Sequence, residues 1–154
     1  MIYWILIVAM ILIDRLVKYW AVTSLKPIGS IPLIQDVFHL TFAKNTGAAF
    51  SILRGKQIFL VVLTSLVIVG LTFLMAKNIK NGGNKMMTLS LALIIGGAIG
   101  NFIDRVRLDY VIDYLNFTLI NFPIFNAADV FIVVGTGLLA ILVIFFNIEM
   151  PDFK

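Results

Sequence analysis

The amino-acid sequence predicts an all-α membrane protein with four transmembrane helices and a small β-containing extracytoplasmic loop region. Hydrophobic residues make up 61% of the 154 residues, and the mean hydropathy is +1.06. Only 13% of the residues are charged, whereas soluble domains are about one-quarter charged. Four segments approach the roughly 20 apolar residues that cross a bilayer. So few polar residues cannot coat a soluble globule, and one integral membrane domain, residues 1–154, is predicted.

The four predicted helices are joined by connections of different character. They span residues 2–22, 58–76, 86–103 and 129–146. The first has no basic start and no small-residue cleavage site, and it is interpreted as a retained helix rather than a signal peptide. The long connection 23–57 contains FHLTFA, whose alternation predicts a short strand. The other connections are the polar turn 77–85 and the partly apolar segment 104–128.

The short turn KNIKNGGNK, residues 77–85, predicts the orientation in the membrane. Its three lysines favour the cytoplasm by the positive-inside rule. Total counts do not decide the question, because the first connection also carries four basic residues. Lysine density in the short turn is the better guide, and it places both termini in the cytoplasm.

Residue types that are rare or missing exclude several kinds of site. The chain has no cysteine and one histidine, His39. A disulfide framework, a thiol nucleophile and a zinc site built from Cys and His are therefore excluded, together with most forms of a Ser-His-Asp triad. The net charge of +4 is spread along the chain, so nucleic acid is not an expected partner. No metal and no cofactor are expected.

Polar residues gather where the predicted helices meet one side of the membrane. With four crossings, the first and third connections share that side. The residues that converge there are Asp14, Arg15, Lys18, Asn101, Asp104, Arg105, Asp113 and Asp129. A charge at this depth costs at least a few kcal/mol. Keeping several charges in one layer therefore requires either compensating partners or a use.

Two interpretations of these residues remain open. Asp129 could cap the last helix, and Asp14 with Lys18 could form a simple i,i+4 ion pair. These roles do not explain why Asp113 and Asp129 both lack an adjacent basic residue. Two carboxylates within hydrogen-bond reach cannot both ionise, so they share a proton. One can then activate water while the other polarises a carbonyl, which is aspartic protease chemistry.

Five motifs, in order along the chain, resemble the bacterial lipoprotein signal peptidases, or signal peptidase II. They are DRLVK at 14–18, KNTGAAF at 44–50, GGAIGNFIDR at 96–105, VID at 111–113 and FNAAD at 125–129. The resemblance implies a four-helix intramembrane aspartyl endopeptidase of the bacterial cytoplasmic membrane, with its active site near the outer face. Such an enzyme removes the signal peptide from diacylglyceryl-modified prolipoproteins, cleaving just before the lipidated cysteine. The implied partners are lipidated prolipoprotein signal peptides and membrane lipids, and a monomer is expected.

The resemblance also implies roles for individual residues near the scissile bond. Asp113 and Asp129 correspond to the catalytic dyad, which activates the attacking water. Asn101 and Arg105 correspond to polar contacts with the substrate backbone. Asn126 corresponds to a partner beside the dyad.

Other motif residues take supporting roles under the same resemblance. Asn45 and Gly47 are implied to hold substrate or to shape a small extracellular sheet, although Gly47 could also be a simple turn glycine. Asp14 and Lys18 are implied to brace the first helix against the polar network. Asp104 resembles a structural partner of a basic group rather than a catalyst.

The chain departs from the family pattern at two places beside the dyad. Asp109 stands where the family commonly has glycine, and Val130 stands where it often has serine. A further feature, the small-residue pair Gly96 and Gly100, predicts close packing of the third helix.

Two other classes of function, a transporter or relay subunit and a structural assembly factor, make different predictions for the polar residues. A transporter or proton-relay subunit should spread ionisable residues through the membrane to both faces, whereas here they stop at one face. A structural assembly factor should tolerate neutral replacement of Asp113 or Asp129. The clustering of the polar residues favours the peptidase.

Overall fold

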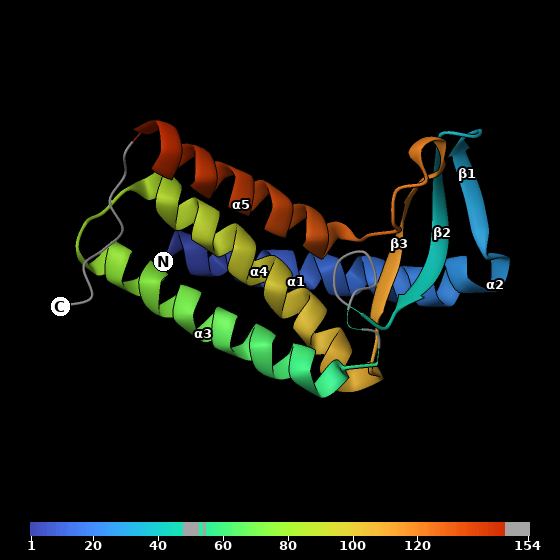
Figure 1. The fold of residues 1–154 in the computed structure, drawn as a ribbon, viewed down its shortest axis with the longest axis horizontal. Helices are drawn as coiled ribbons and strands as arrows, with labels where there is room; N and C mark the ends of the chain where they lie inside the picture. Colours follow the sequence, from blue (N-terminus) through green and yellow to red (C-terminus); the bar gives the residue numbers. More distant parts are fainter. Residues whose placement is uncertain (48–52, 54, 147–154) are drawn as a thin grey trace.

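Four long helices form a bundle, and a small antiparallel sheet lies at one end of it (Figure 1). The computed structural model describes residues 1–47, 53 and 55–146. In chain order the elements are α1 (Ile2–Trp20), a π-helical turn (Ala21–Leu25), α2 (Lys26–Ile28), β1 (Ser30–Ile34), β2 (Phe38–Asn45), α3 (Gln57–Lys80), α4 (Lys85–Leu108), β3 (Val111–Phe117), a 3-10 turn (Thr118–Ile120) and α5 (Ala127–Phe146).

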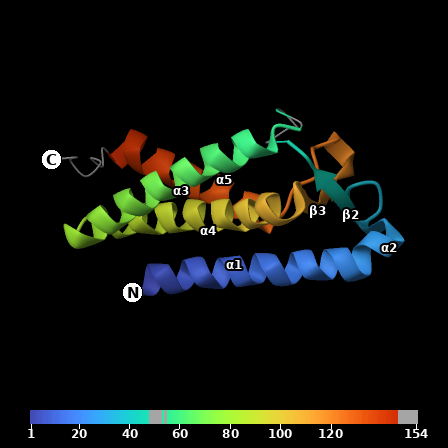
Figure 2. The same cartoon turned by 90° about the horizontal axis from the view of Figure 1, so that it is seen from below.

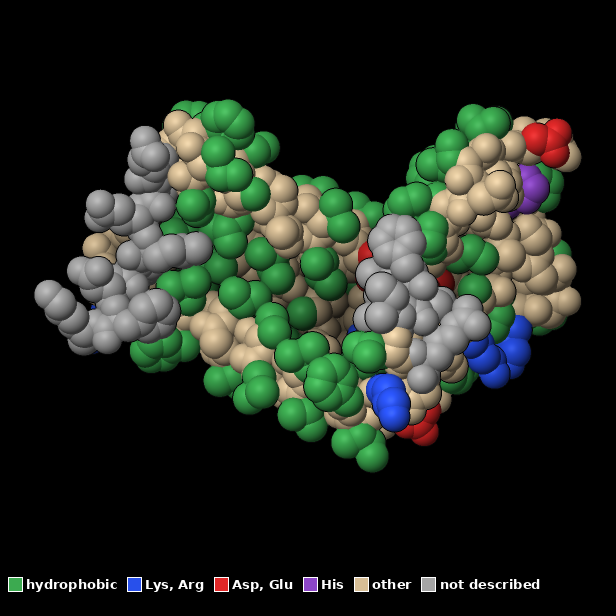
Figure 3. Space-filling view, viewed as in Figure 1, with side chains coloured by type: hydrophobic (Ala, Val, Ile, Leu, Met, Phe, Trp, Pro, Cys, Tyr) green, Lys and Arg blue, Asp and Glu red, His purple; other side chains and the backbone are tan. Residues whose placement is uncertain are grey.

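Helix α4 is the centre of the bundle and packs against α1, α3 and α5. Twelve of its 24 residues are buried, compared with four of 24 in α3 and three of 20 in α5. Apolar side chains therefore remain on the outside of the bundle, as Figure 3 shows. Among the described residues, α3, α4 and α5 are long and apolar enough to cross a membrane. The protein is thus a multi-pass membrane protein.

Helix α1 differs from the other three because it carries charges within its apolar length. Its buried residues, Ile7, Met10, Asp14 and Lys18, recur at intervals of three and four and so lie along one face. This face packs against α4, and Figure 2 shows the two helices side by side. A methyl group added at Gly100 of α4 would lie 2.8 Å from Oδ2 of Asp14. Glycine there permits the close approach of the two helices.

The sheet contains more of the chain than the single strand predicted from FHLTFA. β2 pairs with β1 on one side and with β3 on the other, both antiparallel. The segment 104–128, expected to be a connection, instead contains the last turn of α4 and the whole of β3. Its pairing places Asp113 opposite Ala43 and Val111 opposite Asn45. Strand pairing between such distant segments leaves little local signal in the sequence, which explains the difference.

A cluster of buried hydrophobic side chains joins the sheet to the bundle. Ala21 and Leu25, beyond the end of α1, pack with Ile112 and Tyr114 of β3. Side chains on a strand alternate between its two faces. Burial of Ile112 and Tyr114 in this cluster therefore leaves Asp113 on the opposite face of β3, and that side chain is also buried.

The two ends of the bundle differ in chemistry. The N-terminus, the turn between α3 and α4 and the end of α5 all lie at the end away from the sheet (Figure 1). At that end the Asn84 side chain caps α4 by accepting from the N–H groups of Met86 and Met87. The predicted polar cluster lies at the sheet end. Asp109, just after α4, has φ of 62°, so it occupies the left-handed conformation that glycine adopts most easily.

Candidate active site

Asp129 lies in the first turn of α5 and is held by a reciprocal cap. The Asn126 side-chain oxygen accepts from the Asp129 N–H at 3.0 Å, and the Asn126 N–H donates to Oδ2 of Asp129 at 3.1 Å. This arrangement is a capping box, in which two otherwise unpaired helix N–H groups are satisfied. The predicted capping role of Asp129 is therefore present in the structure. Its other oxygen, Oδ1, accepts from the Asn101 side chain at 2.7 Å.

Asp113 lies in the middle of β3 and is 1% exposed. Its Oδ1 accepts from the Asn126 side-chain amide at 2.6 Å, and the Asn45 side chain also donates to it. Burial, together with the negative charge of Asp129, raises the pKa of Asp113 to about 7. The carboxyl group is therefore poised to hold or release a proton near neutral pH.

Asn101 joins helix α4 to the same network. Its side-chain oxygen accepts from Lys18 Nζ at 2.9 Å and from the Asn126 amide at 3.1 Å. These two donors orient the Asn101 side chain, so that its own amide faces Asp129. Asn101 and Asn126 thus lie beside the two carboxyl groups, and each has its amide donating to one of them. This position was expected for Asn126, whereas Asn101 was expected to contact the substrate backbone.

Four charged side chains form a neutral cluster next to this network. All the ion pairs between described residues lie in this cluster, which consists of Asp14, Arg15, Lys18 and Asp104. The i,i+4 pair between Lys18 and Asp14 is present at 3.1 Å. Asp104 contacts Arg15 at 2.5 Å and Lys18 at 2.9 Å, and it also accepts from the Ile112 N–H. Its partners are therefore on helix α1 and not the adjacent Arg105.

Arg105 and the first connection meet on the other side of the two carboxylates. The Arg105 guanidinium donates to the Gly47 carbonyl at 3.1 Å, and the Gly47 N–H donates to Asn45 Oδ1 at 3.0 Å. Gly47 is buried, whereas residues 48–50 of the KNTGAAF motif lie outside the described residues. Arg105 Nε is buried and has no hydrogen-bond partner among the described residues. The structure therefore brings all nine predicted site residues to one end of the bundle.

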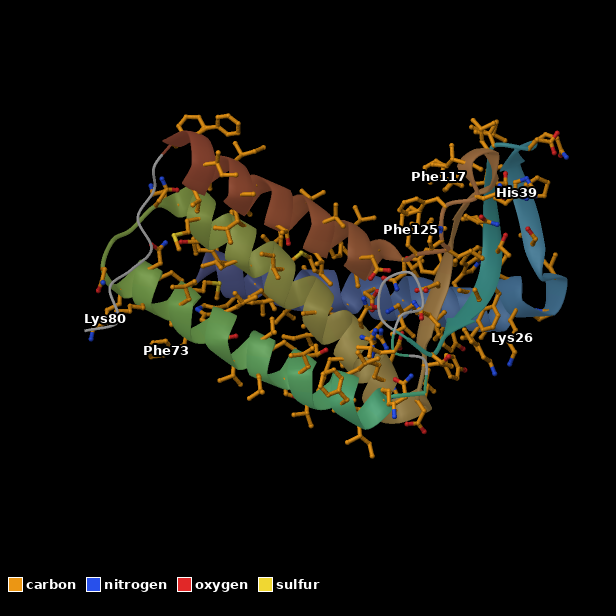
Figure 4. The ribbon with its side chains drawn as sticks, in the orientation of Figure 1. Lys26, His39, Phe73, Lys80, Phe117 and Phe125 are labelled. Atoms are coloured by element: carbon orange, nitrogen blue, oxygen red, sulfur yellow. The ribbon has the colours of Figure 1, made fainter. Side chains whose placement is uncertain are left out.

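Aromatic residues lie beside this site, and the lone histidine lies elsewhere on the sheet. The Phe125 and Phe117 rings are stacked, with their centroids 5.9 Å apart. Both rings lie on the side of the sheet that faces α5 (Figure 4). Figure 3 shows the surface hollowed between the helices and the sheet on this side. His39 lies near the start of β2, paired with Pro32 and Asn116. This position gives no support to a Ser-His-Asp triad.

Two site features were not predicted from the sequence. Arg15, although part of the DRLVK motif, had no role assigned to it, yet it holds both Asp14 and Asp104. Tyr114 follows the VID motif directly, and its hydroxyl accepts from the Ala127 N–H at the start of α5. Burial and the nearby carboxylates raise the pKa of Tyr114 to about 12, so the phenol stays neutral. Only proximity to the motifs could have pointed to either residue.

Taken together, Asp113 is buried and Asp129 is partly buried, and each accepts a hydrogen bond from a side-chain amide. Among the described residues, neither carboxyl group forms an ion pair with a cation. Asp129 accepts two hydrogen bonds at a helix N-terminus, where a negative charge is favoured. Asp113 is more fully buried than Asp129, and burial favours its protonated form. A pair of carboxyl groups in different protonation states can act as base and acid in one reaction.

Comparison with protein families identifies proteins that are similar to this chain in sequence. A family model described as signal peptidase (SPase) II matches residues 6–145. A lipoprotein signal peptidase from Halothermothrix orenii is 47% identical over 136 residues, covering 88% of this chain and 90% of the relative. A lipoprotein signal peptidase from Clostridioides difficile is 44% identical over 148 residues, covering 96% of this chain and 97% of the relative.

Comparison with solved structures gives the same picture for the fold. A bacterial membrane enzyme determined by the in meso method at 2.3 Å resolution matches with a TM-score of 0.83 and 31% identity, covering 99% of this chain and 92% of that one. A second, determined by the same method at 1.9 Å resolution, has a TM-score of 0.80 and 33% identity, covering 93% of this chain and 92% of that one.

Proposed function

This chain belongs to the signal peptidase II family, and from that premise we propose that it is an aspartyl endopeptidase with Asp113 and Asp129 as its catalytic dyad. Its substrates are diacylglyceryl-modified prolipoproteins, and it cleaves just before the lipidated cysteine. The relatives named lipoprotein signal peptidase support this class of substrate. The observation that carries the mechanism is a pair of carboxyl groups, one buried and one partly buried, that both accept hydrogen bonds from Asn126.

The environments of the two carboxyl groups suggest their separate roles. Asp129 is the general base, because two donors and the helix N-terminus stabilise its charge. Asp113 carries the shared proton and donates it to the scissile carbonyl oxygen. Water attacks the carbonyl carbon and gives a proton to Asp129. That proton then passes from Asp129 to the leaving nitrogen of the cysteine as the C–N bond breaks. At the same time one hydroxyl of the tetrahedral intermediate returns its proton to Asp113, which yields the carboxylic acid product and restores the dyad to its starting state.

The neighbouring polar residues serve this reaction in different ways. Asn101 orients Asp129, and the cluster of Asp14, Arg15, Lys18 and Asp104 braces α1 against α4. Arg105 is placed to contact the substrate backbone, since its buried Nε is unpartnered among the described residues. Asn45 and Gly47 frame the same side of the site and complete the contacts with substrate.

The position of the dyad suits a substrate that lies in the membrane. We infer four membrane crossings, with α1 as the fourth, because its charges are buried against α4 and paired. The lysine-rich turn and both termini then lie in the cytoplasm, and the sheet lies at the outer face of the bacterial cytoplasmic membrane. The enzyme works as a monomer on this proposal, because one chain supplies the whole site. A signal peptide crossing as an apolar helix would present its lipidated cysteine at the level of Asp113 and Asp129.

Cleavage of a synthetic diacylglyceryl-modified lipobox peptide by the purified protein in detergent or lipid tests this proposal. Asp113→Asn and Asp129→Asn should each lower kcat by at least about 100-fold, as expected for loss of an acid–base group. Asp109→Asn is the matched control, because it makes the same change four residues from Asp113 at an exposed turn, and it should keep nearly full activity. Thermal unfolding of each variant confirms that it is folded. Cleavage by either folded dyad variant at near the wild-type rate would show that the proposed mechanism is wrong.

A further inference from the structure

Tyr114 links the strand that carries Asp113 to the helix that carries Asp129. Its ring is 3% exposed and packs in the hydrophobic cluster with Ala21 and Leu25. Its hydroxyl oxygen accepts a hydrogen bond of 3.1 Å from the Ala127 N–H. Ala127 is the first residue of α5, so this N–H has no acceptor within its own helix.

This bond differs in kind from the local cap made by Asn126. The capping box joins residues three apart and shapes the first turn, but it does not place that turn relative to the sheet. Tyr114 reaches α5 from a different element. A second attachment lies next to it, where Phe125 exchanges backbone hydrogen bonds of 2.8 and 3.0 Å with Leu115. The chain entering α5 is therefore tied to β3 at two successive points.

We propose that Tyr114 is a positioning residue that sets the first turn of α5 against β3, and so sets the separation of the Asp113 and Asp129 carboxyl groups. This inference rests on the proposed function of that pair. The hydroxyl acts by positioning the helix and not by contacting the reacting atoms. The phenol is buried and neutral, and it lies on the face of β3 opposite to Asp113. A displacement of about 1 Å can reduce a rate by roughly 100-fold, so a small shift of the turn is sufficient to matter.

Removing the bond from either side gives a sharp test. Tyr114→Phe removes the acceptor and keeps the ring. Ala127→Pro removes the donor, and proline is favoured at the first position of a helix, where its missing N–H is tolerated. Tyr110→Phe is the control. Lys44 Nζ lies over the Tyr110 ring, 4.8 Å from its centroid, and Phe preserves this contact. If Tyr114 positions the dyad, both single variants lower kcat by about 10-fold with KM within twofold of the wild type, the double variant is no worse, and Tyr110→Phe is unchanged.

The opposite pattern would overturn the inference. If the hydroxyl serves only to satisfy a buried N–H, Ala127→Pro alone keeps the wild-type kcat and restores both stability and kcat to Tyr114→Phe. A wild-type kcat in Tyr114→Phe would overturn it equally.

A second readout separates this inference from the proposed function. Amide hydrogen exchange at Ala128 and Asp129, in the first turn of α5, should be faster in Tyr114→Phe than in Tyr110→Phe. If the wild type fails to cleave the lipopeptide, the proposed function fails, whereas the exchange rates still report whether Tyr114 holds the turn. Unchanged exchange in Tyr114→Phe would show that the hydrogen bond between Tyr114 and Ala127 does not hold the first turn of α5, and would overturn the inference.

Discussion

The Asn126 side-chain amide donates a hydrogen bond of 2.6 Å to Oδ1 of Asp113. The same residue caps α5 and donates its backbone N–H to Asp129. One asparagine therefore holds both carboxyl groups, one through its side chain and one through its backbone. Because its side-chain oxygen is occupied by the helix cap, the amide group of Asn126 is left facing Asp113.

Asn126→Ser should separate the capping role of this residue from its link to Asp113. Serine is about as good an N-cap as asparagine, so the change of capping residue should alter the free energy of unfolding by no more than a few tenths of a kcal/mol. Serine cannot provide an amide donor to Asp113, so lipopeptide cleavage should fall by at least about 10-fold. Thermal unfolding and kcat measured on the same preparation check both expectations.

Two further variants complete this comparison. Asn126→Ala should lose both functions and should destabilise the protein by about 1 kcal/mol. Asn84→Ser makes the same substitution at the N-cap of α4, at the other end of the bundle, and should leave kcat unchanged. Equal activity of Asn126→Ser and the wild type would contradict a role for the amide at Asp113.

Activity should fall on the alkaline side of neutral pH. Burial and the charge of Asp129 raise the pKa of Asp113 to about 7, and loss of its proton removes the proposed general acid. Initial rates of lipopeptide cleavage between pH 5 and pH 9 should therefore show a decline centred near pH 7. A rate that stays level up to pH 9 would rule out Asp113 as the proton carrier.

The free energy of unfolding should also depend on the ionisation of Asp113. Its dependence on pH should have the opposite sign to that caused by a salt-bridged aspartate. The pKa of Asp113 rises from 3.8 to about 7 on folding, so the folded state binds more protons between these values. The free energy of unfolding therefore falls as pH rises from about 4 to 7, by at most about 1.4 kcal/mol per pH unit. Asp113→Asn removes this dependence. The Tm of Asp113→Asn minus the Tm of the wild type should therefore be larger at pH 8 than at pH 5. A difference that does not change with pH would contradict the assignment.

The ion cluster between α1 and α4 should respond to mutation as a unit. Asp104→Leu alone leaves Lys18 buried without one of its carboxylate partners, and removing one partner of a buried pair typically costs about 3–5 kcal/mol. Lys18→Met combined with Asp104→Leu leaves the Asp14–Arg15 pair intact. The double variant should therefore lose clearly less stability than the sum of the two single variants, as measured by thermal unfolding. Simple additivity would show that the pair is not coupled.

Close packing of α4 against α1 should make Gly100 intolerant of substitution. Gly100→Ala places a methyl group against Asp14 and should destabilise the protein by about 1–3 kcal/mol. Gly70→Ala is the matched control, because Gly70 also lies within a long helix but has nothing within 4 Å of the added methyl group. It should be neutral or stabilising by about 0.5–1 kcal/mol. Equal Tm values for the two variants would contradict this packing argument.

The sequence indicated more about the site than about the sheet that helps to build it. Asp129 is predicted at a helix start because capping is a local pattern, whereas the position of Asn126 beside the dyad comes from the family resemblance alone. Asp113 also comes from a motif, and the sequence does not predict the strand that carries it. The residues of β3 read as part of a connection because their partners on β2 are about 70 positions away in the chain. The sequence does not identify the partner of Asp104 for the same reason, since Arg15 lies 89 residues away from it.

What the sequence determined by itself is the family of the protein and the set of polar residues that gather at one end of the bundle. Hydropathy, helix caps and motifs are properties of residues that are close together in the sequence, so they can be predicted from the sequence alone. Only the tertiary structure decided how Asp113 and Asp129 are joined, which cations neutralise Asp104, and that Tyr114 ties β3 to α5. These contacts depend on strand register and on the close approach of helices, because hydrogen bonds form only when atoms from distant segments come within about 3 Å of each other.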